Sequence, residues 1–501
     1  NIYRLTFVAG ESSLTQSVSD FNADHSVLYA ELEPAQHLFY SPNDSRYSSQ
    51  WYIPKIEANA AWDLWNIAGG NFPGNVNIVL ASVDTGVQYT HPDLWQRVWI
   101  NQAEVPADIF SAVDTDSDGV ITPDEVVAYV SDYDSNNSTN LQDALHPNSP
   151  FMDGIDADDW DSNVSTYVDD LVGWDVAGTT SGDDSDNDPM GTFTGPADSG
   201  NKMHGTHVAG LLAAKTNNST GIASTIFNGS IMSVKVLYDQ SDGGISGGTS
   251  GMLYAAKAGA DILNMSWGGA GYSGSNQAVV NVIHDTYGSV MIAAAGNGND
   301  NGTPSDTPHY PSGYDHVVSV TAVGSGDNFS WANYGNGEGN SQFYGVDISA
   351  PGESILSTVY TTNGNYQSWD GTSMASPIVA SAFGLLKSLY PEQTSEWLTE
   401  NILGTTDPID DLNPNFAGQL GTGRLNIFNA VARQIFPSIS FNSYSLYLVN
   451  DNGDGLLSPG EGALMRINLF NDPGWVDALD VTAVMHSTSE FVTIVDSSGA
   501  Y

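Results

Sequence analysis

The chain has 501 residues, 40% of them hydrophobic, which is enough for several domains and a buried core of ordinary size. Twelve Lys and Arg residues against 59 Asp and Glu residues give a formal charge of −47, which argues against nucleic acid and anionic membranes as partners. The chain has no cysteine, which excludes disulfide bonds and thiolate chemistry, and no run of eighteen apolar residues predicts a membrane span.

The first 40 residues predict a small strand–helix–strand unit. Residues 2–7 and 26–30 are β-prone, and residues 13–21 between them have a helical composition. An ordinary pair of N-terminal strands is the alternative. Asn1 opens no signal peptide, so we expect any such signal to lie upstream of the sequence.

The long middle part, residues 41–437, alternates short apolar, β-branched runs with helical stretches. This alternation predicts an α/β fold with a doubly wound, mostly parallel sheet, whose functional loops gather at the carboxyl ends of the strands. The expected strands are residues 76–83, 231–237, 260–266, 290–295 and 317–323, and the expected helices are residues 205–215, 250–259, 276–286 and 373–389.

A polar, Asp-rich stretch, residues 101–202, interrupts this alternation and is predicted to be an insertion. Within it, residues 114–125 have the spacing of an EF-hand calcium loop. The expected Ca²⁺ ligands are the side chains of Asp114, Asp116, Asp118 and Glu125 and the backbone carbonyl of Val120. A solvated acidic loop is the alternative.

The last part of the chain, residues 438–501, changes character again. Residues 438–449 and 463–469 alternate apolar and polar side chains, as half-buried antiparallel strands do, so we expect a small, all-β, sandwich-like module. Between them, Asn450, Asn452, Asp454 and Glu461 keep EF-hand spacing, with Asn at the first and third positions. A second calcium loop and a plain polar loop are both open.

Four short motifs carry the chemistry. They place Asp84 in Val-Asp-Thr-Gly, His204 in His-Gly-Thr-His, Asn297 in Ala-Gly-Asn and Ser373 in Gly-Thr-Ser-Met-Ala-Ser-Pro. Acyl transfer by a serine needs a base, a carboxylate that orients the base, and a donor for the oxyanion. The order Asp, His, Ser is that of subtilisin, and the surroundings of Ser373 lack the Gly-x-Ser-x-Gly of the α/β-hydrolases.

On these four ordered motifs, the chain resembles the subtilase family of serine proteases across roughly residues 41–438. The resemblance implies an Asp84–His204–Ser373 triad with Asn297 as the side-chain oxyanion donor. It implies a secreted endopeptidase that acts on proteins or peptides and is made as a zymogen. Residues 1–40 would then be the C-terminal part of a propeptide, which inhibits its own enzyme.

The resemblance also places substrate-binding residues. Ser266, Trp267 and Gly268 are similar to the segment that lines the S1 and S4 pockets, and Gly243 and Gly244 to the facing edge. Gly-rich backbone would let an extended peptide add as a strand. His309 falls where the family sets the floor of S1, and a chance placement of this histidine is equally open.

Further calcium ligands are implied by the same resemblance. One site would take the side chains of Asp44, Asp93 and Asn218 and the carbonyls of Thr216, Thr220 and Ile222. Another stretch is similar to an Asp-rich loop of secreted subtilases, with a plain polar loop as the alternative: Asp156, Asp158, Asp169 and Asp170. Without disulfides, bound Ca²⁺ is the expected means of stabilising the folded state.

Two other functions are alternatives to a calcium-stabilised endopeptidase. A non-catalytic calcium-binding surface or adhesion protein on the same fold predicts decay of at least one of Asp84, His204, Asn297 and Ser373, and all four are intact. An esterase would use the same triad, but the extended Gly-rich substrate edge disfavours it.

Overall fold

The structure is a computed structural model with two compact units, Asn1–Tyr40 and Ser41–Tyr501. It describes residues 40–157, 167–177, 185–191, 200–237, 245–299, 301–335, 345–361, 364–435, 437, 439–450, 452–471, 475–478, 482–484 and 498–500. The strands and helix expected within residues 1–39 lie outside these ranges, and the propeptide interpretation stays a prediction.

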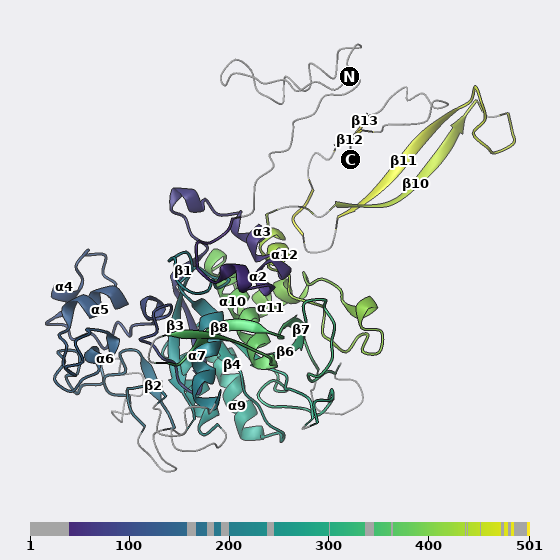
Figure 1. Cartoon of the computed structure of the whole chain (residues 1–501). Coiled ribbons are helices and arrows are strands. Elements are labelled where there is room, and N and C mark those ends of the chain that lie inside the picture. Colours follow the sequence, from purple (N-terminus) through teal and green to yellow (C-terminus); the bar gives the residue numbers. More distant parts are fainter. Residues whose placement is uncertain are drawn as a thin grey trace, which may run out of the picture. The chain divides into compact units, whose positions relative to one another are not determined.

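A seven-stranded sheet of parallel strands forms the centre of the second unit (Figure 1). The strand order is β2-β3-β1-β4-β5-β6-β7. Strands β4 to β7 are buried along their whole length, which explains their continuous apolar sequences. The bounds are β1 (Gly74–Asp84), β2 (Gly173–Asp175), β3 (Asn228–Lys235), β4 (Ile262–Met265), β5 (Val290–Ala294), β6 (Val317–Val323) and β7 (Ile348–Pro351).

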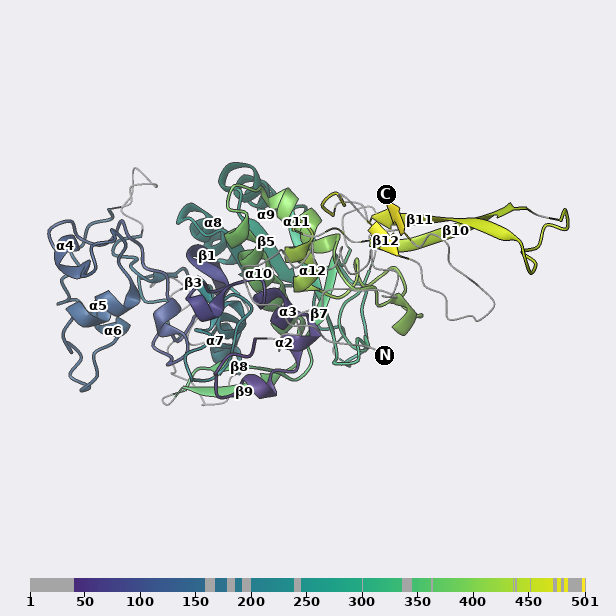
Figure 2. The ribbon, with the colours of Figure 1, turned by 90° about the horizontal axis from the view of Figure 1, so that it is seen from above.

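Helices cover both faces of this sheet, as the sequence predicted (Figure 2). The alternation along β1 separates the faces, because Val79, Ala81 and Val83 pack in the core cluster of α8, whereas Leu80 faces α10. A Cβ on Gly384 of α10 would lie 3.0 Å from Leu80, so this glycine lets the helix approach the sheet closely. The main helices are α7 (Gly200–Ala213), α8 (Gly248–Lys257), α9 (Gly274–Val282) and α10 (Thr372–Leu389).

Shorter elements complete the unit. The α-helices α2 (Tyr52–Lys55), α3 (Ala58–Trp62), α11 (Ser395–Leu403) and α12 (Ile427–Ala432) lie before and after the main run of strands, and a π-helical turn, Ile283–Tyr287, follows α9. Strands β8 (Ile355–Val359) and β9 (Asn365–Trp369) form an antiparallel hairpin just before α10. None of the helices described is long and apolar enough to cross a membrane.

The described part of the predicted insertion contains three short helices and β2 of the central sheet, and it shares a hydrophobic cluster with the main fold. The helices are α4 (Phe110–Val113), α5 (Pro123–Tyr129) and α6 (Leu141–Ala144). Thr122 and Glu125 form a capping box at the start of α5, with a proline in its first turn. The buried cluster joins these helices to Tyr89, five residues after Asp84: Tyr89, Val98, Ile100, Val105, Val113, Ile121, Val126, Val130, Leu141, Ala144, Phe151, Leu171, Val172 and Met190.

The predicted β-module contains the antiparallel hairpin β10 (Ile439–Val449) and β11 (Gly462–Asn471). Register pairs Tyr444 with Ile467 and Leu446 with Met465, which gives one face of the hairpin an apolar character. A further antiparallel pair joins β12 (Thr482–Val484) and β13 (Ser498–Ala500). The expectation of antiparallel strands at the C-terminal end is therefore confirmed.

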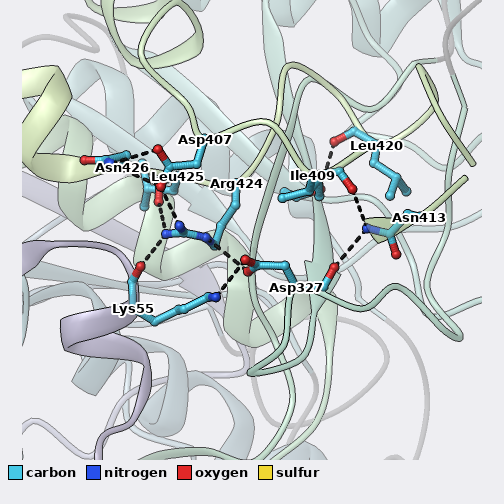
Figure 3. A network of polar contacts seen from close by, with 10 residues as sticks. Lys55, Asp327, Asp407, Ile409, Asn413, Leu420, Arg424, Leu425 and Asn426 are labelled. Carbon is cyan, nitrogen blue, oxygen red and sulfur yellow. Dashed lines mark hydrogen bonds and ion pairs between the residues drawn. The ribbon is translucent and has the colours of Figure 1, made fainter. Parts of the chain in front are cut away.

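A buried polar network ties α2 to the segment before α12 (Figure 3). Asp327 lies between two cations, 2.7 Å from Lys55 Nζ and 3.1 Å from Arg424 Nε. Arg424 also pairs with Asp407, whose carboxylate accepts from Asn426 Nδ2 at 3.0 and 3.1 Å. Because removing one member would leave buried charges uncompensated, the network fixes these segments in one arrangement.

Candidate active site

Asp84 and His204 meet where the carboxyl end of β1 faces the first turns of α7. Asp84 Oδ1 lies 2.7 Å from His204 Nδ1 and also accepts from the backbone N–H of Thr85 at 2.7 Å. Asp84 is 1% exposed, so the carboxylate is shielded from water. A Cβ on Gly205 would lie 2.4 Å from the carbonyl oxygen of Gly86, so only glycine after His204 lets the helix approach this turn.

The Asp84 contact sets both the tautomer and the charge preference of His204. Because Nδ1–H donates to the carboxylate, Nε2 presents its lone pair on the opposite side of the ring. Burial lowers the pKa of His204, but the charge of Asp84 and its hydrogen bond raise it, and the net effect is a pKa above the ordinary value. The His204 side chain is 22% exposed, so a substrate can reach it.

Ser373 is the second residue of α10 and is held by a reciprocal pair of hydrogen bonds. Its Oγ donates to the carbonyl of Ser266 at 3.0 Å, and Ser266 Oγ donates to the carbonyl of Ser373 at 2.9 Å. Pro377 lies four residues further on and has no N–H for the Ser373 carbonyl, so Ser266 supplies that donor. The helix begins at Thr372, one residue before the expected start at residue 373, and Pro377 lies in its second turn.

Asn297 follows β5, and its side-chain amide has a fixed orientation. The backbone N–H and the hydroxyl of Thr372 donate to Asn297 Oδ1 at 3.0 and 2.9 Å. Thr372 Oγ1 in turn accepts from the N–H of Gly296 at 3.2 Å. Since Oδ1 is held against the start of α10, the NH₂ group of Asn297 points away from Thr372, and the exposed side chain presents it to the open site.

Trp369 and His207 support the histidine from behind, and the sequence analysis did not predict the tryptophan. His207 is fully buried, its Nε2 lies 3.0 Å from the carbonyl of Gln367, and burial lowers its pKa to about 3. The Trp369 indole stacks on His207, with centroids 4.5 Å apart, and lies 6.4 Å from the His204 ring. The signal was its place on β9, four residues before Ser373.

Trp267 lines a cavity on this side of the molecule. The cavity has a volume of about 410 Å³ and also contacts Ile245, Gly248 and Gly268. Trp267 Nε1 donates to the carbonyl of Val83 at 2.7 Å, which ties this edge to the residue before Asp84. Gly243 and Gly244 lie outside the described residues, so the structure does not place the facing edge.

His309 lines a separate polar hollow next to Asn297. The hollow, about 370 Å³, also contacts Gly298, Asn299 and Thr307. His309 Nδ1 lies 3.3 Å from Asn333 Nδ2. His309 Nδ1 also lies against Gly296, the residue before the candidate oxyanion donor, and the interpretation of His309 as the floor of a substrate pocket stays a prediction.

The EF-hand-like loop brings three of its predicted ligands together. Carboxylate oxygens of Asp114, Asp116 and Asp118 lie within 4.8 Å of one another, and Asp114 Oδ1 is buried without a hydrogen-bond partner. The N–H of Val120 donates to Asp118. Glu125 lies at the last position of the loop, where both carboxylate oxygens accept from Thr115 and Thr122.

A second acidic loop, residues 132–143, was missed in the sequence. Oxygens of Asp132, Asp134 and Asp143 also lie within 4.8 Å of one another. Its backbone hydrogen bonds match those of residues 114–125 position by position, for example from the sixth N–H to the first carboxylate at 2.9 and 3.1 Å. Its sixth residue is Asn137 in the left-handed region, φ 67°, where the usual pattern has glycine, and this hid the spacing.

In the ligand set taken from the resemblance, the loop 216–222 contacts the buried carboxylates of Asp44 and Asp93. Asp44 accepts from the N–H groups of Asn217 and Asn218, and Asp93 accepts from Asn218 Nδ2 at 2.9 Å and from the N–H of Ile222 at 2.9 Å. Burial, with a smaller contribution from the nearby charge of Asp44, raises the pKa of Asp93 to about 7. Thr216 and Thr220 belong to the same loop, which contacts both carboxylates.

The structure describes parts of both remaining candidate calcium sites, the stretch from Asp156 to Asp170 and the C-terminal loop. Asp169 and Asp170 are buried, but Asp170 accepts from Asn101 Nδ2 and Tyr254 Oη, and Asp169 accepts from the N–H of Gly154. Asp156 has one buried oxygen without a hydrogen-bond partner, and Asp158 lies outside the described residues. In the C-terminal loop, Glu461 accepts from the N–H groups of Asn452 and Ser458.

Comparison with known proteins agrees with this architecture. A model of the subtilase family, Peptidase_S8, matches residues 75–423. Thermitase from Thermoactinomyces vulgaris is 31% identical over 78% of this chain and 99% of its own, and a thermophilic serine proteinase from a Bacillus strain is 30% identical over 83% and 75%. A solved protease structure from Pseudoalteromonas arctica shares the fold, with 24% identity, a TM-score of 0.53, and 78% and 99% of the two chains covered.

The parallel sheet and these relatives thus define a serine endopeptidase. The chain belongs to the subtilase family. The resemblance given in the sequence analysis is confirmed, as is the predicted fold class.

Proposed function

We propose that Ser373 is the nucleophile, His204 the general base, Asp84 the carboxylate that orients it and Asn297 the oxyanion donor of a secreted, calcium-stabilised endopeptidase. The observation that supports this most is the 2.7 Å contact between Asp84 and His204, because it leaves Nε2 to accept a proton. Proteins or peptides are the substrates, and residues 1–40 act as an inhibitory propeptide. The alternative is a non-catalytic calcium-binding protein on the same fold.

The reaction would begin with a small movement of Ser373. In this structure its hydroxyl donates to Ser266, so a rotation about its Cα–Cβ bond brings Oγ to His204 Nε2 when substrate binds. His204 takes the proton as Oγ attacks the peptide carbonyl, and Asp84 stabilises the imidazolium. The NH₂ of Asn297 and the N–H of Ser373 at the start of α10 then meet the oxyanion.

A covalent serine probe combined with a digest of denatured protein separates the three candidate functions. An endopeptidase is labelled at Ser373 and cleaves the denatured protein at internal bonds. An esterase is labelled but leaves the denatured protein intact. A retired binding protein is not labelled, and this result would contradict the proposal.

We expect activity to follow the ionisation of His204. The base works only when neutral, and the raised pKa keeps it protonated to a higher pH than free histidine. The value of kcat/KM should therefore rise with pH, with a midpoint above about 6.5. The measurement is kcat/KM for a peptide substrate across pH 5–9, and a flat profile through this window would contradict a histidine base.

The acidic loops fit Ca²⁺, which prefers carboxylate and carbonyl oxygens. In the loop 114–125, Asp114, Asp116, Asp118, Glu125 and the carbonyl of Val120 would hold the ion. The buried Asp114 oxygen without a hydrogen-bond partner supports this assignment.

The Asp44–Asp93 pair fits an ion in the same way. Two buried carboxylates lie close together there and disfavour each other's charge. Thr216, Asn218, Thr220 and Ile222 would complete that site. A bound ion would hold both loops in their folded geometry and supply no chemistry to the reaction.

Removing the first loop's ligands should remove one bound ion. We expect Asp114→Ala with Glu125→Ala, in a Ser373→Ala background that prevents self-digestion, to bind one Ca²⁺ fewer by calorimetry. Each site stabilises the fold by about 2.7 kcal/mol when free Ca²⁺ is a hundred times its Kd, so thermal stabilisation by Ca²⁺ should fall accordingly.

The matched control is Asp411→Ala with Glu392→Ala, which removes two exposed carboxylates elsewhere. This control should bind as many ions as the parent. Equal stoichiometry in the parent and in the loop variant would show that residues 114–125 are only a solvated acidic loop.

A further inference from the structure

Gly298, the residue after Asn297, is imposed by close packing. Its φ is +74°, and a Cβ there would lie 2.2 Å from the carbonyl oxygen of Trp331 and 2.3 Å from that of Thr303. Both contacts are with backbone, which cannot move aside as a flexible side chain can. The fold therefore requires glycine at 298, and the candidate oxyanion donor belongs to an Asn-Gly dipeptide.

An Asn-Gly dipeptide can undergo deamidation without an enzyme. The backbone nitrogen of Gly298 attacks Asn297 Cγ, the Cγ–Nδ2 bond breaks, and ammonia leaves with the proton from the glycine nitrogen. The resulting succinimide then reacts with water and opens to aspartate or isoaspartate. Glycine favours this step because it has no side chain to obstruct the attack.

Hydrogen bonds in the structure hold both reacting groups of this dipeptide in place. Gly298 N–H donates to Asn333 Oδ1 at 2.8 Å, so losing its proton or turning toward Cγ breaks a hydrogen bond to a buried side chain. Asn333 is fully buried, with an exposed fraction of 0%, and its Nδ2 donates to the carbonyl of Thr307 at 3.1 Å. The Asn297 amide is itself held by Thr372.

The same loop contains a second dipeptide of this kind at the surface, Asn301-Gly302, whose asparagine Oδ1 accepts from the hydroxyl of Thr303 at 2.7 Å. Both residues are exposed, and the N–H of Gly302 donates to the carbonyl of Asn299 within a surface turn. Hydrogen bonds of exposed turns open far more readily than buried ones. One loop thus holds two copies of the same reactive dipeptide, and they differ in whether a buried acceptor holds the glycine N–H.

From this contrast we propose that Asn297 is a deamidation site whose rate is set by Asn333, a positioning residue. The chemistry at 297 does not depend on the proposed function. Its consequence does, because an aspartate at 297 would put a carboxylate where the oxyanion forms and end catalysis. Asn333 then determines how long the folded enzyme stays active.

The test uses the Ser373→Ala chain, which cannot digest itself if the proposed function holds. Mass spectrometry measures deamidation whether or not that function holds. The chain is incubated in mildly alkaline buffer, native and in urea, and peptides covering Asn297 and Asn301 are quantified for deamidation. We expect Asn297 to react more slowly than Asn301 in the native chain and at a similar rate in urea. Equal native rates would overturn the proposal.

A variant identifies Asn333 as the cause. Asn333→Ala should accelerate deamidation at Asn297 by about fivefold or more, the size expected for one lost hydrogen bond, and leave Asn301 unchanged. Asn333→Asp keeps an acceptor for Gly298 N–H and should restore part of the protection. Acceleration at both sites would indicate general loosening, and an unchanged Asn297 rate in Asn333→Ala would remove Asn333 from the account.

Discussion

Replacing Ser373 by alanine should lower kcat on the order of 10⁶-fold, to the background that binding and the oxyanion donors alone provide. The hydroxyl is the atom that forms the acyl-enzyme, and nothing else at the start of α10 can replace it. The fold should survive, because the substitution removes only one hydrogen bond of the reciprocal pair, and Ser266 still donates to the Ser373 carbonyl.

The measurement is kcat on a peptide substrate together with the far-UV spectrum and the melting temperature. Ser388→Ala is the matched control, since this serine lies near the other end of the same helix and bonds only to the carbonyl of Leu385. It should keep wild-type activity. Turnover by Ser373→Ala near the wild-type rate would contradict the nucleophile assignment.

Asn297→Ala should lower kcat by about 10² to 10³-fold with little change in KM. The Asn297 amide acts on charge that exists only in the transition state, so its loss costs about 2.7–4 kcal/mol there and little in the bound substrate. A change confined to KM would count against the oxyanion role.

Thr372→Val gives a graded comparison for the same site. It removes the hydroxyl that donates to Asn297 Oδ1 but keeps the backbone donor, so the amide keeps part of its orientation. We expect a kcat between those of wild type and Asn297→Ala. A kcat below that of Asn297→Ala would mean that Thr372 acts on something other than this amide.

The sequence predicted the elements that a local pattern of residues defines. Buried parallel strands such as β5 and β6 are continuous apolar runs, and Asp84 and Asn297 were expected at carboxyl ends because each follows such a run. The Asp84–His204 contact was implied by the order of the motifs, since an oriented base needs a carboxylate at Nδ1.

Other features depend on contacts that no local pattern reveals. Strands β2 and β7 have three and four residues, too short to show periodicity, and they form because a neighbouring strand edge is there to pair with. Asn333 lies 36 residues from Asn297, and its role depends entirely on Gly298 approaching it in space. The second acidic loop was hidden because Asn137 adopts the backbone conformation expected of glycine.

The hydrophobic cluster of residues 101–202 has a consequence for protein engineering. Because Tyr89 and Val98 of the main fold share that cluster, the acidic segment cannot be excised or transplanted as an independent unit. A deletion of residues 101–202 would expose the tyrosine five residues from Asp84 to water, and it would also remove β2 and the first residues of α7. Shortening this protease therefore requires redesigning the loop that follows β1, whereas a graft of the acidic segment onto another scaffold must carry residues 89–100 with it.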